Sequence, residues 1–131
     1  MITILLVEDS VGDAFLAKKA LEPIHNWVAL DHVVDGEDAL DLLKRKLPDL
    51  ILLDWNLPNI SGQDLLQTVK TTEEWKHVPV VVFTTSSAEE DVIRAYTNYA
   101  NAYLVKPIDL NAFTNVLQTL GLFWALVATT V

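Results

Sequence analysis

Residues 50–58 read LILLDWNLP, a run of four apolar residues that stops at an acid, Asp54. A continuous apolar run of this length is typical of a parallel β-strand that is covered on both faces. Such a strand does not need a carboxylate at its end, and an ordinary turn would more often carry glycine. The stretch therefore predicts a core strand that brings Asp54 to a place where its charge has a use.

Similar short apolar runs recur along the chain and alternate with segments of helical pattern. The expected strands are Ile2–Val7, Trp27–Val34, Leu50–Leu53, Val80–Phe83 and Ala102–Val105, and the expected helices are Gly12–Glu22, Glu37–Lys46, Gly62–Thr71, Ala88–Tyr99 and a fifth after Ile108. Asp31 and His32 interrupt the second run, which indicates an edge strand. Strands that alternate with helices of about ten residues indicate βαβ units with right-handed crossovers. We expect an α/β fold of the type (βα)5, in one domain that spans residues 1–131.

Composition limits the classes of function. The 131 residues, 51% of them hydrophobic, are enough for one domain with a buried core. The chain has no cysteine, which excludes disulfides and thiol chemistry. A net charge of −9 argues against binding to nucleic acid or to an anionic membrane surface. Because no basic leader segment precedes the first apolar run, we expect a cytoplasmic protein.

Polar residues follow four of the expected strands at the point where the apolar run stops. They are Glu8 and Asp9 after the first strand, Asp54 and Asn56 after the third, Thr84 after the fourth and Lys106 after the fifth. The carboxyl ends of parallel strands share one edge of an open sheet, and ligands bind there. Clustered acids favour a hard cation such as Mg²⁺, and a carboxylate can attack phosphorus while a lysine and a hydroxyl hold the transferred oxygens. The pattern therefore predicts phosphoryl transfer to a carboxylate.

The motifs LLVEDS, LLDWNLP, VVVFTTS and AYLVKP, in this order, resemble those of response-regulator receiver domains of the CheY-like type, over essentially the whole chain. The resemblance implies a flavodoxin-like, doubly wound sheet of five parallel strands in the order 2-1-3-4-5. It also implies a two-component response regulator that accepts a phosphoryl group from a sensor histidine kinase. Such a domain is not an enzyme in the usual sense, because it catalyses only its own phosphorylation and slow dephosphorylation.

The same resemblance implies a role for each acid at the strand ends. Asp54 would be the phospho-acceptor. The metal ligands would be Glu8, Asp9, Asp54 and the backbone carbonyl of Asn56, with Mg²⁺ as the cofactor.

Three further roles follow from the resemblance. Thr84 and Lys106 would bind the phosphoryl group, with the peptide bond between Lys106 and Pro107 in the cis form. Tyr103 would be the switch aromatic, whose ring turns inward after phosphorylation as Thr84 moves. The output surface would then be formed by the fourth helix, the fifth strand and the fifth helix.

A narrower likeness concerns the segments TTEEWKHVP and LGLFWALV, which are similar to segments of response regulators paired with bacterial phytochromes, chiefly cyanobacterial ones. Those relatives are single-domain proteins that tend to dimerise. The likeness implies a phytochrome as the partner kinase and a homodimer.

The last part of the chain, residues 110–131, contains no charged residue. It has the pattern of an amphipathic helix and not of a membrane span, and its expected inward face comprises Phe113, Val116, Leu117, Leu120 and Trp124. If the helix continues past Gly121, then Leu122, Phe123 and Leu126 are left for a dimer contact on an apolar extension, residues 121–131. The alternative is that Gly121 ends the helix and the tail folds back on its own domain.

Two other functions remain open at this point. A haloacid-dehalogenase-type phosphatase also forms an aspartyl phosphate, but it requires a second acid two residues after the nucleophile, where this chain has Asn56. A receiver-shaped interaction module that signals without phosphorylation is disfavoured by the full set of acids. The histidines His25, His32 and His77 have no metal-ligand spacing, and we expect solvated loop or edge positions for them.

Overall fold

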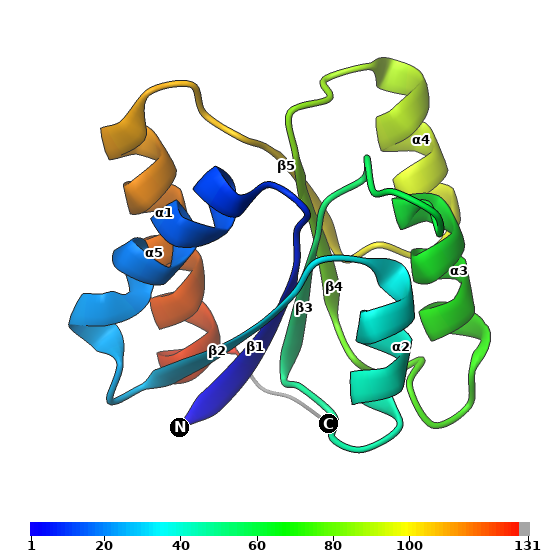
Figure 1. Ribbon diagram of the computed structural model, residues 1–131, viewed down its shortest axis with the longest axis horizontal. Helices are drawn as coiled ribbons and strands as arrows, with labels where there is room; N and C mark the ends of the chain where they lie inside the picture. The colour runs from blue at the N-terminus through cyan, green and yellow to red at the C-terminus, as the bar shows by residue number, and fades with distance from the viewer. Residues whose placement is uncertain (129–131) are drawn as a thin grey trace.

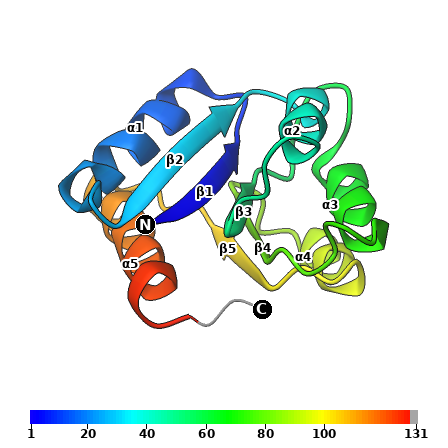
Figure 2. The same ribbon diagram turned by 90° about the horizontal axis from the view of Figure 1, so that it is seen from below.

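The computed structural model of the chain, which describes residues 1–128, contains one five-stranded parallel sheet (Figures 1 and 2). The strands are β1 (Ile2–Val7), β2 (Val28–Val33), β3 (Leu50–Leu53), β4 (Val80–Thr84) and β5 (Ala102–Val105). Their order in the sheet is β2-β1-β3-β4-β5, as the resemblance implies. The edge position expected for the second strand is confirmed, and β5 forms the other edge.

Helices cover both faces of this sheet. They are α1 (Val11–Leu21), the short 3-10 helix η1 (Glu22–Ile24), α2 (Gly36–Leu43), α3 (Gly62–Thr71), α4 (Glu89–Thr97) and α5 (Leu110–Leu126). Figures 1 and 2 show α1 and α5 on one face, with α2, α3 and α4 on the other. The predicted (βα)5 architecture is confirmed.

Four of these helices begin at a side chain that replaces the missing hydrogen-bond partners of the first turn. Ser10, Asp35, Ser61 and Asp109 each accept a hydrogen bond from the backbone N–H of the residue three positions further on. Among the α-helices the exception is α4, which begins after Ala88 without a side-chain cap. Its first turn instead carries three acids, which the positive end of the helix dipole favours.

The sheet separates two hydrophobic clusters. Along β1, Leu5 and Val7 point into a cluster with α2, α3 and α4, which we term the α2–α4 core. Ile4 and Leu6 point into a cluster with α1 and α5, which we term the α1–α5 core. Because successive side chains of a strand alternate between its faces, a strand covered on both sides is apolar throughout. This explains the continuous apolar run that precedes Asp54.

The fifth helix continues through Gly121 to Leu126, so the alternative in which Gly121 ends the helix is wrong. Gly121 is buried, and a Cβ there would lie 3.0 Å from Cδ2 of Leu21 and 3.1 Å from Cδ1 of Ile24. The glycine therefore allows α5 to approach the junction of α1 and η1 closely.

The expected inward face of α5 is confirmed. Phe113 and Leu117 are buried in the α1–α5 core, and the other three members, Val116, Leu120 and Trp124, pack against it. No helix among the described residues is long and apolar enough to cross a membrane. The last three residues of the predicted apolar extension, 129–131, lie outside the described part of the chain.

Candidate functional site at the carboxyl ends of the strands

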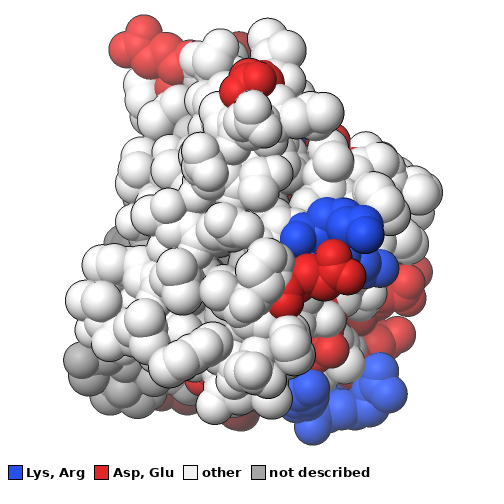
Figure 3. Space-filling view, turned by 90° about the vertical axis from the view of Figure 1, so that its left-hand side faces the viewer, with Lys and Arg blue, Asp and Glu red and all other residues white. Residues whose placement is uncertain are grey.

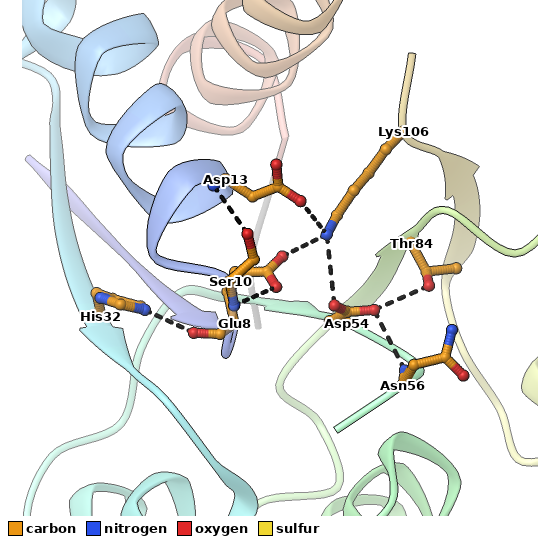
Figure 4. A network of polar contacts seen from close by, with 8 residues as sticks. All are labelled: Glu8, Ser10, Asp13, His32, Asp54, Asn56, Thr84 and Lys106. Carbon is orange, nitrogen blue, oxygen red and sulfur yellow. Dashed lines mark hydrogen bonds and ion pairs between the residues drawn. The ribbon is translucent and has the colours of Figure 1, made fainter. Parts of the chain in front are cut away.

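The buried polar side chains of residues 1–128 are gathered in one place. They are Glu8, Asp54, Thr84 and Lys106, and Figure 4 shows all four converging where the strands end. Burying a charge costs free energy unless partners offset it, so a buried acid–lysine group indicates a site that the fold maintains for its chemistry.

Asp54 lies directly after β3 and is held by contacts with residues at the ends of the other strands. Its backbone N–H donates to the carbonyl of Val7 on β1 at 3.1 Å. Its Oδ1 accepts hydrogen bonds from the Thr84 hydroxyl at 2.8 Å and from the Asn56 N–H at 3.2 Å. Its Oδ2 lies 3.4 Å from Nζ of Lys106. The carboxylate is therefore oriented from two sides.

The loop after Asp54 is pressed against the start of α3. The Gly62 N–H donates to the carbonyl of Trp55 at 3.1 Å. A Cβ on Gly62 would lie 2.7 Å from the Asp54 carbonyl oxygen and equally close to Cα of Trp55. Because these are backbone atoms, only glycine fits without displacing the residue that carries the carboxylate.

Lys106 reaches into the site from the end of β5 and contacts three acids. Its Nζ lies 2.5 Å from Oε1 of Glu8, 2.8 Å from Oδ2 of Asp13 and 3.4 Å from Oδ2 of Asp54. Burial alone would lower the pKa of Lys106, but the hydrogen bonds to Asp13 and Glu8 outweigh it and raise the pKa above its usual value. The lysine therefore remains an ammonium.

Glu8 is the acid most affected by its surroundings. Burial raises its pKa to about 7, the Lys106 ammonium opposes this rise, and the nearby Asp54 adds to it. The backbone N–H of Ser10 donates to the other carboxylate oxygen, Oε2, at 3.1 Å. One lysine thus only partly offsets the negative charge of this site.

A divalent cation fits this arrangement. Glu8, Asp9 and Asp54 each offer a carboxylate oxygen, and these oxygens lie within 4.8 Å of one another. The donors are all oxygens, as hard cations such as Mg²⁺ and Mn²⁺ require, and a cation would favour the ionised form of Glu8, whose pKa is raised by burial and by the nearby Asp54. Asn56 is exposed, and its carbonyl remains a predicted ligand.

Tyr103, the predicted switch aromatic, lies with its ring packed against the α2–α4 core. Its hydroxyl donates to the carbonyl of Ser86 at 2.8 Å, and its backbone N–H donates to the hydroxyl of Tyr96 at 3.1 Å. Burial raises the pKa of Tyr103, so the phenol is neutral and able to donate. The ring is partly buried against this core, Thr84 contacts Asp54, and the role of Tyr103 as a switch stays a prediction.

The predicted cis form of the peptide bond between Lys106 and Pro107 is wrong. Every peptide bond in the described part of the chain is trans. The preference between the two forms is small before proline, about 0.5–1 kcal/mol, and residue type alone does not decide it.

Two residues at this site escaped sequence reasoning. Asp13, in the first turn of α1, is an ion-pair partner of Lys106. Its position three residues after the cap Ser10, beside the end of β1, could have indicated it. His32 is an edge-strand residue as expected, but it is half-buried and its Nε2 donates to the carbonyl of Glu8 at 2.8 Å. Its place opposite Leu6 in the β1–β2 register, near the strand ends, was the available indication.

Comparison with known proteins gives a consistent result. Residues 4–118 match the response regulator receiver domain family. The response regulator Rcp1 of Synechocystis sp. is 37% identical over an alignment of 132 positions, which covers 92% of this chain and 87% of Rcp1. A protein described as the probable methanogenesis regulatory protein FilR2, from Methanothrix harundinacea, is 36% identical over 92% of this chain and 82% of its own length.

Solved structures agree over nearly the full length of the chain. The Mn²⁺-bound form of Rcp1 superposes with a TM-score of 0.92 at 36% identity, covering 100% of this chain and 99% of that one. The phosphorylated cyanobacterial phytochrome response regulator RcpA superposes with a TM-score of 0.94 at 33% identity, covering 98% and 97% of the two chains.

Proposed function

Because this chain belongs to the response regulator receiver domain family, we propose that it is phosphorylated on Asp54. The chain is a two-component response regulator. The observation that carries the proposal is the setting of one buried carboxylate, with the Thr84 hydroxyl 2.8 Å from one oxygen and the Lys106 ammonium 3.4 Å from the other.

In the proposed reaction, a carboxylate oxygen of Asp54 attacks the phosphorus of a phosphohistidine. A P–O bond forms as the P–N bond breaks, and the histidine nitrogen keeps the electron pair of the broken bond. Thr84 contacts one oxygen of the Asp54 carboxylate and Lys106 contacts the other. The two side chains are therefore suited to hold the oxygens of a phosphoryl group attached to Asp54. The side chains of this chain thus supply the nucleophile and most of the groups that stabilise the transferred phosphoryl group.

For the metal we propose Mg²⁺, held by Glu8, Asp9, Asp54 and the backbone carbonyl of Asn56. The closeness of the three carboxylates supports this choice, as does the solved Mn²⁺-bound form of Rcp1. The cation would neutralise the negative charge that develops on the phosphoryl oxygens.

The test is to incubate the protein with Mg²⁺ and acetyl phosphate, beside the variant Asp54→Asn. We expect one phosphoryl group per wild-type chain by intact-protein mass spectrometry and none on the variant. Continued release of inorganic phosphate at a high rate would favour the phosphatase alternative. An unlabelled wild type would favour the interaction module that acts without phosphorylation.

The proposed phosphodonor is a sensor histidine kinase, specifically a bacterial phytochrome, because RcpA is a phytochrome response regulator. Exposed apolar side chains lie on α1, at Val11 and Phe15, and before and at the start of α5, at Ile108 and Leu110. A groove of about 240 Å³ lies between these two segments and includes Lys106 in its lining. An apolar rim around a charged centre suits a kinase helix that presents phosphohistidine.

We also propose a homodimer built on α5. Phe123 and Leu126 are exposed and Leu122 is half-buried. Beside them a groove of about 400 Å³ is lined by Leu104, Asn115, Val116, Thr119, Leu120 and Phe123. Figure 3 shows a broad uncharged area on this side of the molecule, with Lys and Arg toward its right-hand edge and Asp and Glu at its top and right-hand edge.

Charge supports a second copy as the occupant of this face. Two chains of net charge −9 repel each other, and an uncharged helix offers the contact with the least repulsion. A single domain over residues 1–131 and a cytoplasmic location stay predictions.

A further inference from the structure

The Lys106 ammonium has two close partners in this site and one distant partner. Glu8 and Asp13 lie 2.5 and 2.8 Å from Nζ, whereas Asp54 lies 3.4 Å away. Figure 4 shows Asp13 reaching Lys106 from α1, on the side opposite Thr84. The side chain of Lys106 is 5% exposed and that of Asp13 is 31% exposed, so this ion pair is partly shielded from water. Contacts of this kind fix a lysine more firmly than an exposed pair would.

Asp13 differs from the other two partners in one respect. Glu8 and Asp54 belong to the group of three acids whose oxygens could hold a cation, and Asp13 does not. A cation bound by Glu8, Asp9 and Asp54 offsets the negative charge of Glu8 and Asp54. The same cation repels the Lys106 ammonium. Asp13 is then the remaining carboxylate within hydrogen-bond distance of Lys106 among the described contacts.

We propose that Asp13 is a positioning residue that keeps the Lys106 ammonium beside Asp54 when the three-acid group holds its cation. The proposal rests on the proposed phosphorylation of Asp54. An ammonium has three donors, so Lys106 can keep its bond to Asp13 and still donate to an oxygen of a phosphoryl group on Asp54. Asp13 therefore lowers the competition between lysine and cation for Glu8 and Asp54, and it places the lysine for the transfer.

A purely local role for Asp13 must be separated from this one, because an acid in the first turn of a helix is favoured by the helix dipole. The chain offers a matched control in Asp64. Asp13 follows the cap Ser10 and Asp64 follows the cap Ser61 by three residues, and the N–H of each acid donates to the serine hydroxyl, at 3.2 and 3.1 Å. The two acids share their capping position, but Asp13 alone of the two contacts a lysine.

The experiment compares Asp13→Asn with Asp64→Asn, each in the wild-type and in the Lys106→Ala background. Mg²⁺ affinity is measured by isothermal titration calorimetry, and phosphorylation by acetyl phosphate is measured at saturating Mg²⁺. We expect Asp13→Asn to weaken Mg²⁺ binding and to slow phosphorylation, each on the order of fivefold. Asp64→Asn removes the same charge and leaves both quantities unchanged. With Lys106→Ala, the substitution at Asp13 has no further effect on Mg²⁺ affinity.

Several results would overturn the proposal. Equal values for the wild type and Asp13→Asn would remove its basis, and so would the same loss of Mg²⁺ affinity in both backgrounds, since Asp13 would then act without Lys106. Faster phosphorylation of Asp13→Asn would mean that Asp13 restrains the lysine instead of placing it. If the wild type itself is not phosphorylated, the proposed function fails, while the Mg²⁺ titrations of the variants still decide whether Asp13 acts through Lys106.

Discussion

The hydroxyl of Thr84 donates a 2.8 Å hydrogen bond to Oδ1 of Asp54, and Thr84 is completely buried. The bond joins the last residue of β4 to the residue that follows β3, at the carboxyl ends of both strands. A buried hydroxyl that contacts a carboxylate this closely sets the orientation of the carboxylate.

Replacing Thr84 by alanine removes this donor. A hydrogen bond to a charged group contributes about 1.5–3 kcal/mol, so we expect Thr84→Ala to be phosphorylated by acetyl phosphate about ten- to a hundredfold more slowly. Thr84→Ser keeps the hydroxyl and should remain close to the wild type. Rates come from the time course of label, and an alanine variant as fast as the serine variant would contradict the role of the hydroxyl.

Glu8 predicts an unusual dependence of stability on pH. Its pKa is about 7 in the folded protein, against 4.5 for the free group. Between these values the folded state holds a proton that the unfolded state has lost, so the free energy of unfolding falls as the pH rises. We expect the free energy of unfolding of the wild type to fall by up to about 3 kcal/mol between about pH 5 and about pH 8, relative to that of Glu8→Gln.

Saturating Mg²⁺ should abolish that loss, because the cation favours the ionised form of Glu8. Urea denaturation at both pH values, with and without Mg²⁺, measures the effect. A wild-type curve that runs parallel to that of Glu8→Gln would show that Glu8 titrates normally.

Gly62 and Gly12 should respond oppositely to alanine. At Gly62 the new Cβ meets the backbone of Asp54 and Trp55 at 2.7 Å, so we expect Gly62→Ala to lower the free energy of unfolding by about 1–3 kcal/mol and to slow phosphorylation. At Gly12, in α1, the nearest atom is 3.9 Å away, so alanine should stabilise the helix by up to about 1 kcal/mol. Chemical denaturation of the two variants tests both signs. A tolerated alanine at Gly62 would mean that the acceptor loop is not held against α3.

The proposed dimer predicts that Phe123→Asp sediments as a monomer at concentrations where the wild type sediments as a dimer. A charge buried at an apolar contact destabilises it, since the carboxylate loses its hydration. Leu47→Asp, at another exposed apolar position away from α5, is the control and should leave the mass unchanged. Equal masses for the wild type and Phe123→Asp would exclude this face as the contact.

The proposed kinase contact predicts a selective effect of Phe15→Asp. The side chain of Phe15 is exposed on α1, and among the described residues its phenyl ring makes no hydrogen bond or ion pair with the acids of the site. Phosphorylation of Phe15→Asp by acetyl phosphate should therefore be unchanged. Transfer from a phosphorylated histidine kinase should fall at least about tenfold, because a buried apolar contact is lost. Equal losses with both donors would point to damage at the site itself.

Much of this architecture could be read from the sequence because parallel strands covered on both faces are short apolar runs with visible ends. The acids, the threonine and the lysine follow those ends, so their meeting was predictable from the order of the strands. Asp13 and His32 were not, because their contacts depend on how the first turn of α1 and the edge strand β2 face the site. Sequence spacing places both residues near the strand ends but does not say which way their side chains face. The form of the bond before Pro107 was predicted wrongly, since small energies decide it.

The division of the interior into the α1–α5 core and the α2–α4 core has a consequence for protein engineering. The acids of the candidate site lie at the carboxyl ends of the strands, between two separately packed halves, and the backbone of the sheet is what these halves share. A chimaera that takes one layer of helices from a relative should therefore retain its chemistry, provided that Asp13 on α1 is kept and that the inward side chains of the strands on the exchanged face are replaced with it. Recognition of partners could then be redesigned one layer at a time.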